Sequence, residues 1–161
     1  MSTPREQPWR DPTGTETQGR LVVLTRNPIA EAIGVIASTA GRDVVVVDED
    51  EEGRGLAAVQ SVGLREGDAV VLCDHDAPDA PAVLRHALAS PASYVAMMAS
   101  RRRSEGLLAE LAEEGASGLD KLRVPAGLDT GGKTAGEIAL SVVAEVVATA
   151  YGRSGRPMRE L

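Results

Sequence analysis

Aromatic residues are scarce in this chain: they make up 2% of 161 residues, with no phenylalanine, one tryptophan and two tyrosines. Proteins that bind single-stranded nucleic acid stack bases on aromatic side chains, and this sequence has few to offer. Positive charge is also in deficit, because 24 acidic residues stand against 17 basic ones and the formal net charge is −7. Both shortages argue against a nucleic-acid partner.

Cysteine and long apolar runs are lacking as well. The single cysteine, Cys73, cannot form a disulfide within the chain or supply a cysteine-based structural zinc site. No apolar run approaches the roughly 18 residues of a membrane span, and the first residues lack the charged-then-apolar pattern of a signal segment. We therefore expect a cytoplasmic protein without a membrane partner.

The length fits about one domain, with a polar segment at each end. Residues 1–19 contain three prolines and two glycines, and residues 152–161 are again mostly polar. Such segments bury too little apolar surface to fold alone. The sequence therefore predicts a flexible arm over 1–19, one domain over 20–151 and a flexible tail over 152–161.

Within that domain, short β-branched runs alternate with longer helical patterns. The predicted strands are 21–25, 43–48, 69–73, 93–97 and 121–124, and the predicted helices are 28–40, 54–62, 80–89, 101–114 and 134–150. Several strands are apolar at consecutive positions, which is typical of strands covered on both faces. The alternation predicts an α/β fold, a doubly wound and mainly parallel sheet of five to six strands in a Rossmann-like three-layer sandwich. In such sheets ligands bind beyond the carboxyl ends of the strands.

The loop after the first strand lacks the glycines of a dinucleotide fingerprint. Asn27 is suited to cap a helix that begins at Pro28, and Arg26 adds bulk in front of it. Asp48 closes the second predicted strand, where an acid can hold a ribose hydroxyl but is also a common turn residue. Arg26 and Asp48 stay candidate binding residues, while ordinary NAD(P) binding is disfavoured.

Asp74, His75 and Asp76 follow the third predicted strand. They could bind a metal or transfer protons, or they could be polar loop residues that cap the next helix. No distant second group of ligands accompanies them, which favours the capping interpretation over a metal site. Cys73 precedes them, and without a histidine partner we interpret it as a small buried residue.

The loop after the fourth predicted strand is strongly basic. Ser100 is a natural N-cap, and Arg101, Arg102 and Arg103 fill the first helical turn. Cations at a helix N-terminus are unfavourable by roughly 0.3–1 kcal/mol each. A bound anion would reverse that sign, because guanidinium groups and free N–H groups both bind it. The alternative is a solvated basic turn offset by Glu105.

The loop over 127–134, GLDTGGKT, matches the phosphate-loop pattern G-x-x-x-x-G-K-[ST]. It follows the last predicted strand, so no later strand can supply the acid that holds magnesium in nucleotide hydrolysis. The loop still forms a second candidate anion cradle. Its residues are Gly127, Asp129, Thr130, Gly131, Gly132, Lys133 and Thr134. We expect this cradle and the basic turn to converge on one phosphate-bearing ligand.

Two motifs give the chain a family resemblance. A tyrosine–valine strand runs into Ser-Arg-Arg at 100–102, and Gly-Leu-Asp-x-Gly at 127–131 precedes a Thr-x-x-Glu-Ile-Ala helix start at 134. In these motifs the sequence resembles the Rossmann domain of the XdhC/CoxI family of xanthine dehydrogenase accessory factors. The resemblance extends to individual residues over about 68–150, whereas over 21–48 only the order of strands and helices is similar.

The resemblance implies a role in the maturation of molybdenum hydroxylases such as xanthine and carbon monoxide dehydrogenases. Members bind the molybdenum cofactor, a pterin with a phosphate and often a nucleotide, and aid its sulfuration and delivery. The implied partners are an apo molybdenum hydroxylase subunit and a separate subunit of the family's N-terminal type, and the fold is compatible with a homodimer. Matched by position are Ser100, Arg101, Arg102, Gly127, Leu128, Asp129, Gly131, Thr134 and Glu137, with Asp74, His75 and Asp76 in the family's His/Asp loop.

The chain departs from the family pattern in three places. The first loop lacks glycines, Ala96 and Ala99 stand where members carry glycines, and the sequence lacks the family's N-terminal domain. No acid–base or nucleophile set is recognisable, so the sequence favours a cofactor chaperone over an enzyme. Two alternatives stay open: an NAD(P)-binding oxidoreductase or nucleotide-sensing domain, and a degenerate Rossmann scaffold that acts through protein contacts.

Overall fold

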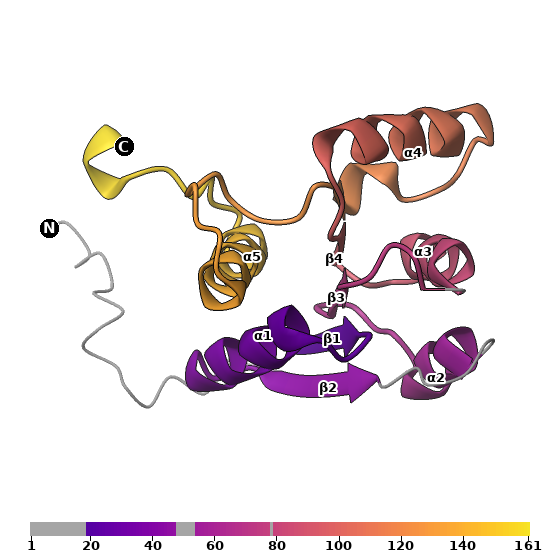
Figure 1. Ribbon diagram of the computed structural model, residues 1–161, viewed down its shortest axis with the longest axis horizontal. Helices are drawn as coiled ribbons and strands as arrows, with labels where there is room; N and C mark the ends of the chain where they lie inside the picture. Colours follow the sequence, from indigo (N-terminus) through magenta and orange to yellow (C-terminus); the bar gives the residue numbers. More distant parts are fainter. Residues whose placement is uncertain (1–18, 48–53, 78) are drawn as a thin grey trace, which may run out of the picture.

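The computed structural model describes residues 19–47, 54–77 and 79–161 (Figure 1). Five strands alternate with five helices, which confirms the predicted α/β class. The strands are β1 (Arg20–Leu24), β2 (Asp43–Val47), β3 (Ala69–Leu72), β4 (Tyr94–Met97) and β5 (Leu122–Arg123). The helices are α1 (Pro28–Thr39), α2 (Arg54–Val62), α3 (Ala80–Ala89), α4 (Arg101–Glu113) and α5 (Ala135–Ala150), with short 3₁₀ turns η2 (Leu119–Lys121) and η3 (Met158–Glu160). Residues 1–18 of the predicted arm and Asp48 lie outside the described residues.

All five strands are parallel, in the order β2-β1-β3-β4-β5. The chain moves outward in one direction from β1 to β2 and in the other from β3 to β5. The strand order therefore reverses between β1 and β3, which is where open α/β sheets usually bind their ligands. Val22 of β1 marks this centre, since it pairs with Val45 on one side and Val70 on the other.

Helices cover both faces of the sheet. Helices α1 and α5 contact each other and cover one face, where Ile33 and Val142 are fully buried. Helices α2, α3 and α4 cover the other, through Val59, Leu84 and Leu111 (Figure 1). Right-handed crossovers explain the positions of the four helices that connect strands. Helix α1 leads from β1 to β2 in one direction along the sheet, whereas α2, α3 and α4 lead in the other direction, so they must cover the opposite face.

Element ends differ from the prediction by a few residues. The strand predicted over 121–124 is reduced to Leu122 and Arg123, because Lys121 belongs to η2 and Pro125 has no N–H to donate. Residues 152–161 are exposed and include η3. None of the described helices has the length and apolar content needed to cross a bilayer.

A buried ion pair ties the amino edge of the sheet. The guanidinium of Arg20 donates from Nε to Asp68 Oδ1 at 3.0 Å and from Nη2 to Asp68 Oδ2 at 2.6 Å. Asp68 has no exposed surface, and Oδ2 also accepts from the Arg65 N–H at 2.8 Å. Burial opposes ionisation of Asp68, but the hydrogen bonds from Arg20 and Arg65 outweigh it and lower the pKa of the carboxyl.

The variant Asp68→Ala should lower the free energy of unfolding by about 3 kcal/mol in urea denaturation. This is the low end of the range for a broken buried pair, because Arg20 keeps some exposure. In the wild type, the pair's contribution is complete above the unfolded-state pKa of about 3.9 and is lost as pH falls through the lower folded-state pKa. The exposed pair Arg85–Glu114 is the control, and a Glu114→Gln effect as large as that of Asp68→Ala would contradict the assignment.

Candidate functional site: a groove between α3 and α4

The side chain of Asn27 lies at the strand-order reversal, between the loops after β1 and β3. Its Oδ1 accepts from the Ala30 N–H at 2.9 Å, which confirms the predicted N-cap with Pro28 at the first helical position. Its Nδ2 donates to the Cys73 carbonyl at 3.2 Å, so the residue bridges the loops after β1 and β3. A pyrophosphate at the start of α1 would compete with this side chain. Arg26 lies exposed beside it.

The backbone conformation at Thr25 could not be predicted from the sequence. This residue has φ +70°, in the left-handed region that β-branched side chains rarely adopt. Its N–H donates to the Val47 carbonyl at 3.2 Å, which keeps the turn against β2. The first loop therefore makes a glycine-like turn without a glycine.

The loop after β3 is held by its own polar groups. Asp74 Oδ1 accepts from the Asp76 N–H at 2.9 Å, which makes a local turn within the loop. The N-cap of α3 is Asp79, so the interpretation of Asp74, His75 and Asp76 as caps of this helix is wrong. His75 Nδ1 lies 3.0 Å from the Met98 carbonyl, and its Nε2 lies 3.3 Å from Asp76 Oδ2. Arg103 Nη1 donates to Asp76 Oδ1 at 3.0 Å, so this loop is joined to the start of α4. No group of three or more potential metal ligands is brought together in the described part of the chain.

The N-terminus of α4 carries the predicted cap and its arginines. Ser100 Oγ accepts from the Arg103 N–H at 3.2 Å, and the Ser100 carbonyl accepts from the N–H and the hydroxyl of Ser104. The side chains of Arg101, Arg102 and Arg103 are exposed. Arg103 is paired with Asp76, whereas no residue of the described chain pairs with Arg102. Arg102 is thus available to a ligand.

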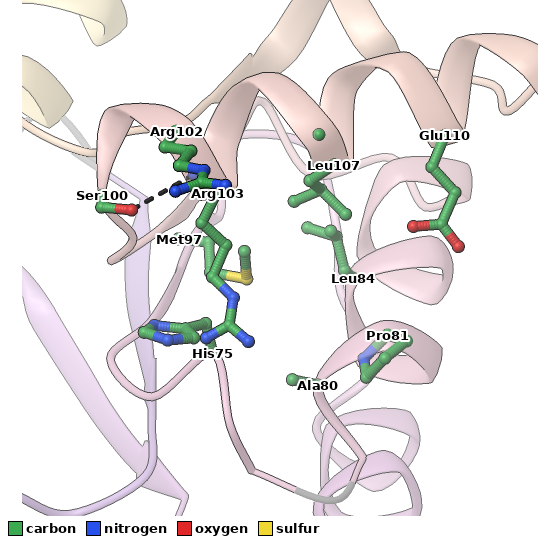
Figure 2. Close-up of a pocket in the computed structure, with 11 residues that line it drawn as sticks. His75, Ala80, Pro81, Leu84, Met97, Ser100, Arg102, Arg103, Leu107 and Glu110 are labelled. Carbon is green, nitrogen blue, oxygen red and sulfur yellow. Dashed lines mark hydrogen bonds between the residues drawn. The ribbon is translucent and has the colours of Figure 1, made fainter.

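A groove of about 640 Å³ opens between α3 and α4 at the carboxyl edge of the sheet (Figure 2). His75, Ser100, Arg102 and Arg103 lie at one end, and Glu110 lies at the other. The middle is apolar and is lined by Ala80, Pro81, Leu84, Met97 and Leu107. Its volume falls within the range of small-molecule sites. Such a groove suits a flat, largely apolar ligand that carries a negative charge at one end.

The 127–134 loop is occupied by the chain's own carboxylate. Glu137 Oε1 accepts from the N–H groups of Lys133 and Thr134, each at 3.2 Å, while Thr134 Oγ1 accepts from the Glu137 N–H at 3.1 Å. These reciprocal hydrogen bonds form a capping box at the start of α5. The same backbone hydrogen bonds lower the pKa of Glu137, so it stays ionised. Glu137 therefore takes the position that a phosphate would occupy.

Packing accounts for two glycines of this loop. Gly127 has φ +101°, and a Cβ there would lie 2.6 Å from Ser141 Oγ. A Cβ on Gly132 would lie 2.6 Å from the Cβ of Glu137. Both glycines let the loop run against α5, where the Leu128 N–H donates to the Ser141 carbonyl at 3.2 Å. The phosphate-loop pattern is thus explained here by close packing on α5.

The structure does not bring the two predicted cradles into one pocket. Thr130, Gly131, Gly132 and Lys133 line a separate cavity of about 360 Å³ with Glu137 and Leu140, and it shares no residue with the α3–α4 groove. The expectation of convergence is therefore not met. Its physical reason is that α4 and α5 cover opposite faces of the sheet.

The predicted site residues thus divide into those that line the groove, those that line the second cavity and those that line neither. Ser100, Arg102 and His75 line the groove, and four residues of the 127–134 loop line the second cavity. Neither cavity is lined by Arg26, Asp74, Arg101, Gly127, Asp129 or Thr134.

Glu145 is a structural residue that the sequence did not reveal. Its Oε1 accepts from the Tyr94 hydroxyl at 2.6 Å and from the Gly127 N–H at 3.2 Å, so it joins β4, the 127–134 loop and α5. Burial and this carboxylate raise the pKa of Tyr94, which stays protonated. Cys73 is buried as predicted, and burial raises the pKa of its thiol to about 12.

Substitutions in the 127–134 loop should follow packing. Gly127→Ala should lower the free energy of unfolding by about 3 kcal/mol, because left-handed strain and overpacking each cost roughly 1–3 kcal/mol. Gly131→Ala is the matched control: it also has positive φ, but its Cβ would meet nothing within 4 Å, so about 1 kcal/mol is expected. Equal losses in urea denaturation would contradict this packing account.

Comparisons with known proteins agree with this fold. The profile of the XdhC Rossmann domain matches residues 21–146. The uncharacterized protein YqeB of Escherichia coli K12 is 27% identical over 146 residues, which cover 80% of this chain and 27% of YqeB. A crystal structure of a xanthine dehydrogenase from Bacillus halodurans is similar in fold, with a TM-score of 0.66 at 19% identity over 85% of this chain and 44% of that one.

This chain thus spans about a quarter of YqeB and less than half of the Bacillus protein. At 19% identity the second likeness shows the fold alone. The profile match is the decisive one, because it covers β1 through most of α5. The chain belongs to the XdhC Rossmann-domain family.

Proposed function

We propose that this protein is an accessory factor in the maturation of a molybdenum hydroxylase and that its α3–α4 groove holds an anionic molybdopterin-type cofactor or nucleotide. Membership of the XdhC Rossmann-domain family supports the accessory role. The observation that carries the ligand proposal is the groove itself, where Arg102 and the N-terminus of α4 stand beside an apolar floor. A helix N-terminus and a guanidinium group both favour a phosphate.

The residues of the groove fit a pterin that carries a phosphate. Arg102 and Ser100 would hold the phosphate, while Met97 and Leu107 would contact the flat ring system. The bound group would supply its own metal and sulfur chemistry. The chain offers no thiolate for that chemistry, because Cys73 is its only cysteine and is buried with a raised pKa of about 12.

The groove is open, which suits a protein that accepts a cofactor and passes it on. An apo molybdenum hydroxylase subunit in the cytoplasm is the proposed recipient, and a separate subunit of the family's N-terminal type would supply any sulfur transfer. The NAD(P) alternative is less favoured, because the Asn27 side chain accepts from the start of α1 and bridges to Cys73 at the position where a dinucleotide would bind.

The variant Arg102→Ala should weaken binding of a molybdopterin-type cofactor roughly tenfold to a hundredfold. A hydrogen bond to a charged group is worth about 1.5–3 kcal/mol, and about 1.4 kcal/mol is a factor of ten. Binding is measured by direct titration, with thermal unfolding to check that the fold is intact. Arg101→Ala is the matched control, because Arg101 is adjacent but does not line the groove.

Equal affinity of the wild type and Arg102→Ala would contradict the proposal. Loss of binding in Lys133→Ala with no loss in Arg102→Ala would move the site to the cavity at α5. If a hydroxylase subunit co-purifies while no cofactor binds, the chain acts as a scaffold through protein contacts alone.

A further inference from the structure

One stripe of α4 faces the groove and carries opposite charges at its two ends. Arg103, Gly106, Leu107 and Glu110 recur at the three- and four-residue spacing of one helical face, and all four line the groove. Figure 2 shows the arginines at one end of the groove and Glu110 at the other, with Leu84 and Leu107 between them. The groove is therefore polarised along its length.

Glu110 is available to accept hydrogen bonds. It has no hydrogen-bond or ion-pair partner within the described residues, and its side chain is exposed at the groove. Arg85 interacts electrostatically with Glu110, but its guanidinium donates its hydrogen bonds to Glu114, at 2.9 and 2.6 Å. Both oxygens of Glu110 thus remain open to a donor in the groove.

Gly106 has no role in the fold that accounts for it. It lies within α4, where glycine is a poorer helix former than alanine, and its φ is not positive. A Cβ at this position would meet nothing within 4 Å. The glycine does line the groove between the two charged ends, so its missing side chain leaves room for a ligand.

We propose that this groove selects a phosphate-bearing heterocycle with a 2-amino-4-oxo pyrimidine ring, the edge that pterins and guanine share. The ring N–H and the 2-amino group would donate side by side to the two oxygens of Glu110. The phosphate would pair with Arg102, and the ring would pass over Gly106. This inference rests on the proposed function, because it assigns the other end of the same ligand.

The dimensions and the chemistry agree with this class of ligand. Glu110 lies eight positions after Arg102, which is about 12 Å along a helix at about 1.5 Å per residue. That span suits a mononucleotide or a pterin phosphate. An adenine would present a ring nitrogen that accepts hydrogen bonds, so it would face the carboxylate with an unpaired acceptor. A carboxylate therefore discriminates between the two kinds of ring edge.

The experiment compares guanosine and inosine 5′-monophosphates, which differ only in the 2-amino group. Calorimetric titration of the full chain should show guanosine monophosphate binding at least tenfold more tightly. In Glu110→Gln this preference should fall to within about twofold, while Arg102→Ala should weaken both nucleotides. The control Glu113→Gln, on the same helix but outside the groove, should keep the wild-type preference.

Equal binding of the two nucleotides by the wild type, or no binding of either, would overturn the inference. If the two nucleotides bind equally but Arg102→Ala weakens both, only the role of Glu110 is overturned and the proposed function stands. If they bind equally and Arg102→Ala has no effect, the proposed function is overturned as well. A neopterin phosphate in the same titration identifies the source of the ring. Tighter binding than the nucleotide assigns the groove to a pterin, and weaker binding assigns it to a guanine nucleotide.

A second variant tests the contact at Gly106. Gly106→Ala should raise the melting temperature, because alanine is the better helix former, and should weaken guanosine monophosphate at least fivefold. Gly136→Ala in α5, which also has open space at its Cβ, should leave binding unchanged. Unchanged binding in Gly106→Ala would contradict the placement of the ring over Gly106.

Discussion

Helix N-termini at the carboxyl edge of a parallel sheet present N–H groups that need acceptors, and the way each is satisfied decides where a ligand can bind. At α1 the acceptor is Asn27, which also bridges to Cys73. At α5 it is Glu137, whose carboxylate accepts from Lys133 and Thr134. At α4 Ser100 takes one N–H group, and three arginines stand around it. Only α4, among these three, gathers positive charge beside an open groove.

This arrangement makes an acidic chain locally attractive to an anion. The formal net charge of −7 repels a phosphate-bearing ligand overall, whereas the exposed arginines at the start of α4 attract it. Arg103 joins α4 to the loop after β3 through Asp76, which fixes one wall of the groove. The groove thus depends on two loops that follow adjacent strands.

The sequence was sufficient for the fold and for half of the site. Consecutive apolar residues and cap positions predicted the strands and helices, and the carboxyl-edge rule marked Ser100 and Arg102 as candidate binding residues. His75, which the sequence analysis interpreted as a polar loop residue, lies beside them in the groove. It could not place α5, because the crossover rule applies only where a further strand follows. The 127–134 loop consequently lies with α1 on the opposite face. The three- and four-residue spacing of Gly106 and Glu110 from Arg103 is visible in the sequence. Only the structure shows that this face of α4 lines a groove.

A crystal structure of the chain soaked with guanosine 5′-monophosphate or a neopterin phosphate tests the central claim most directly. Our account predicts ligand density between α3 and α4, with the phosphate within hydrogen-bond distance of Arg102 and the ring near Glu110. Density in the crevice between β1 and β3, or against Lys133 at the start of α5, with the groove empty, would contradict it.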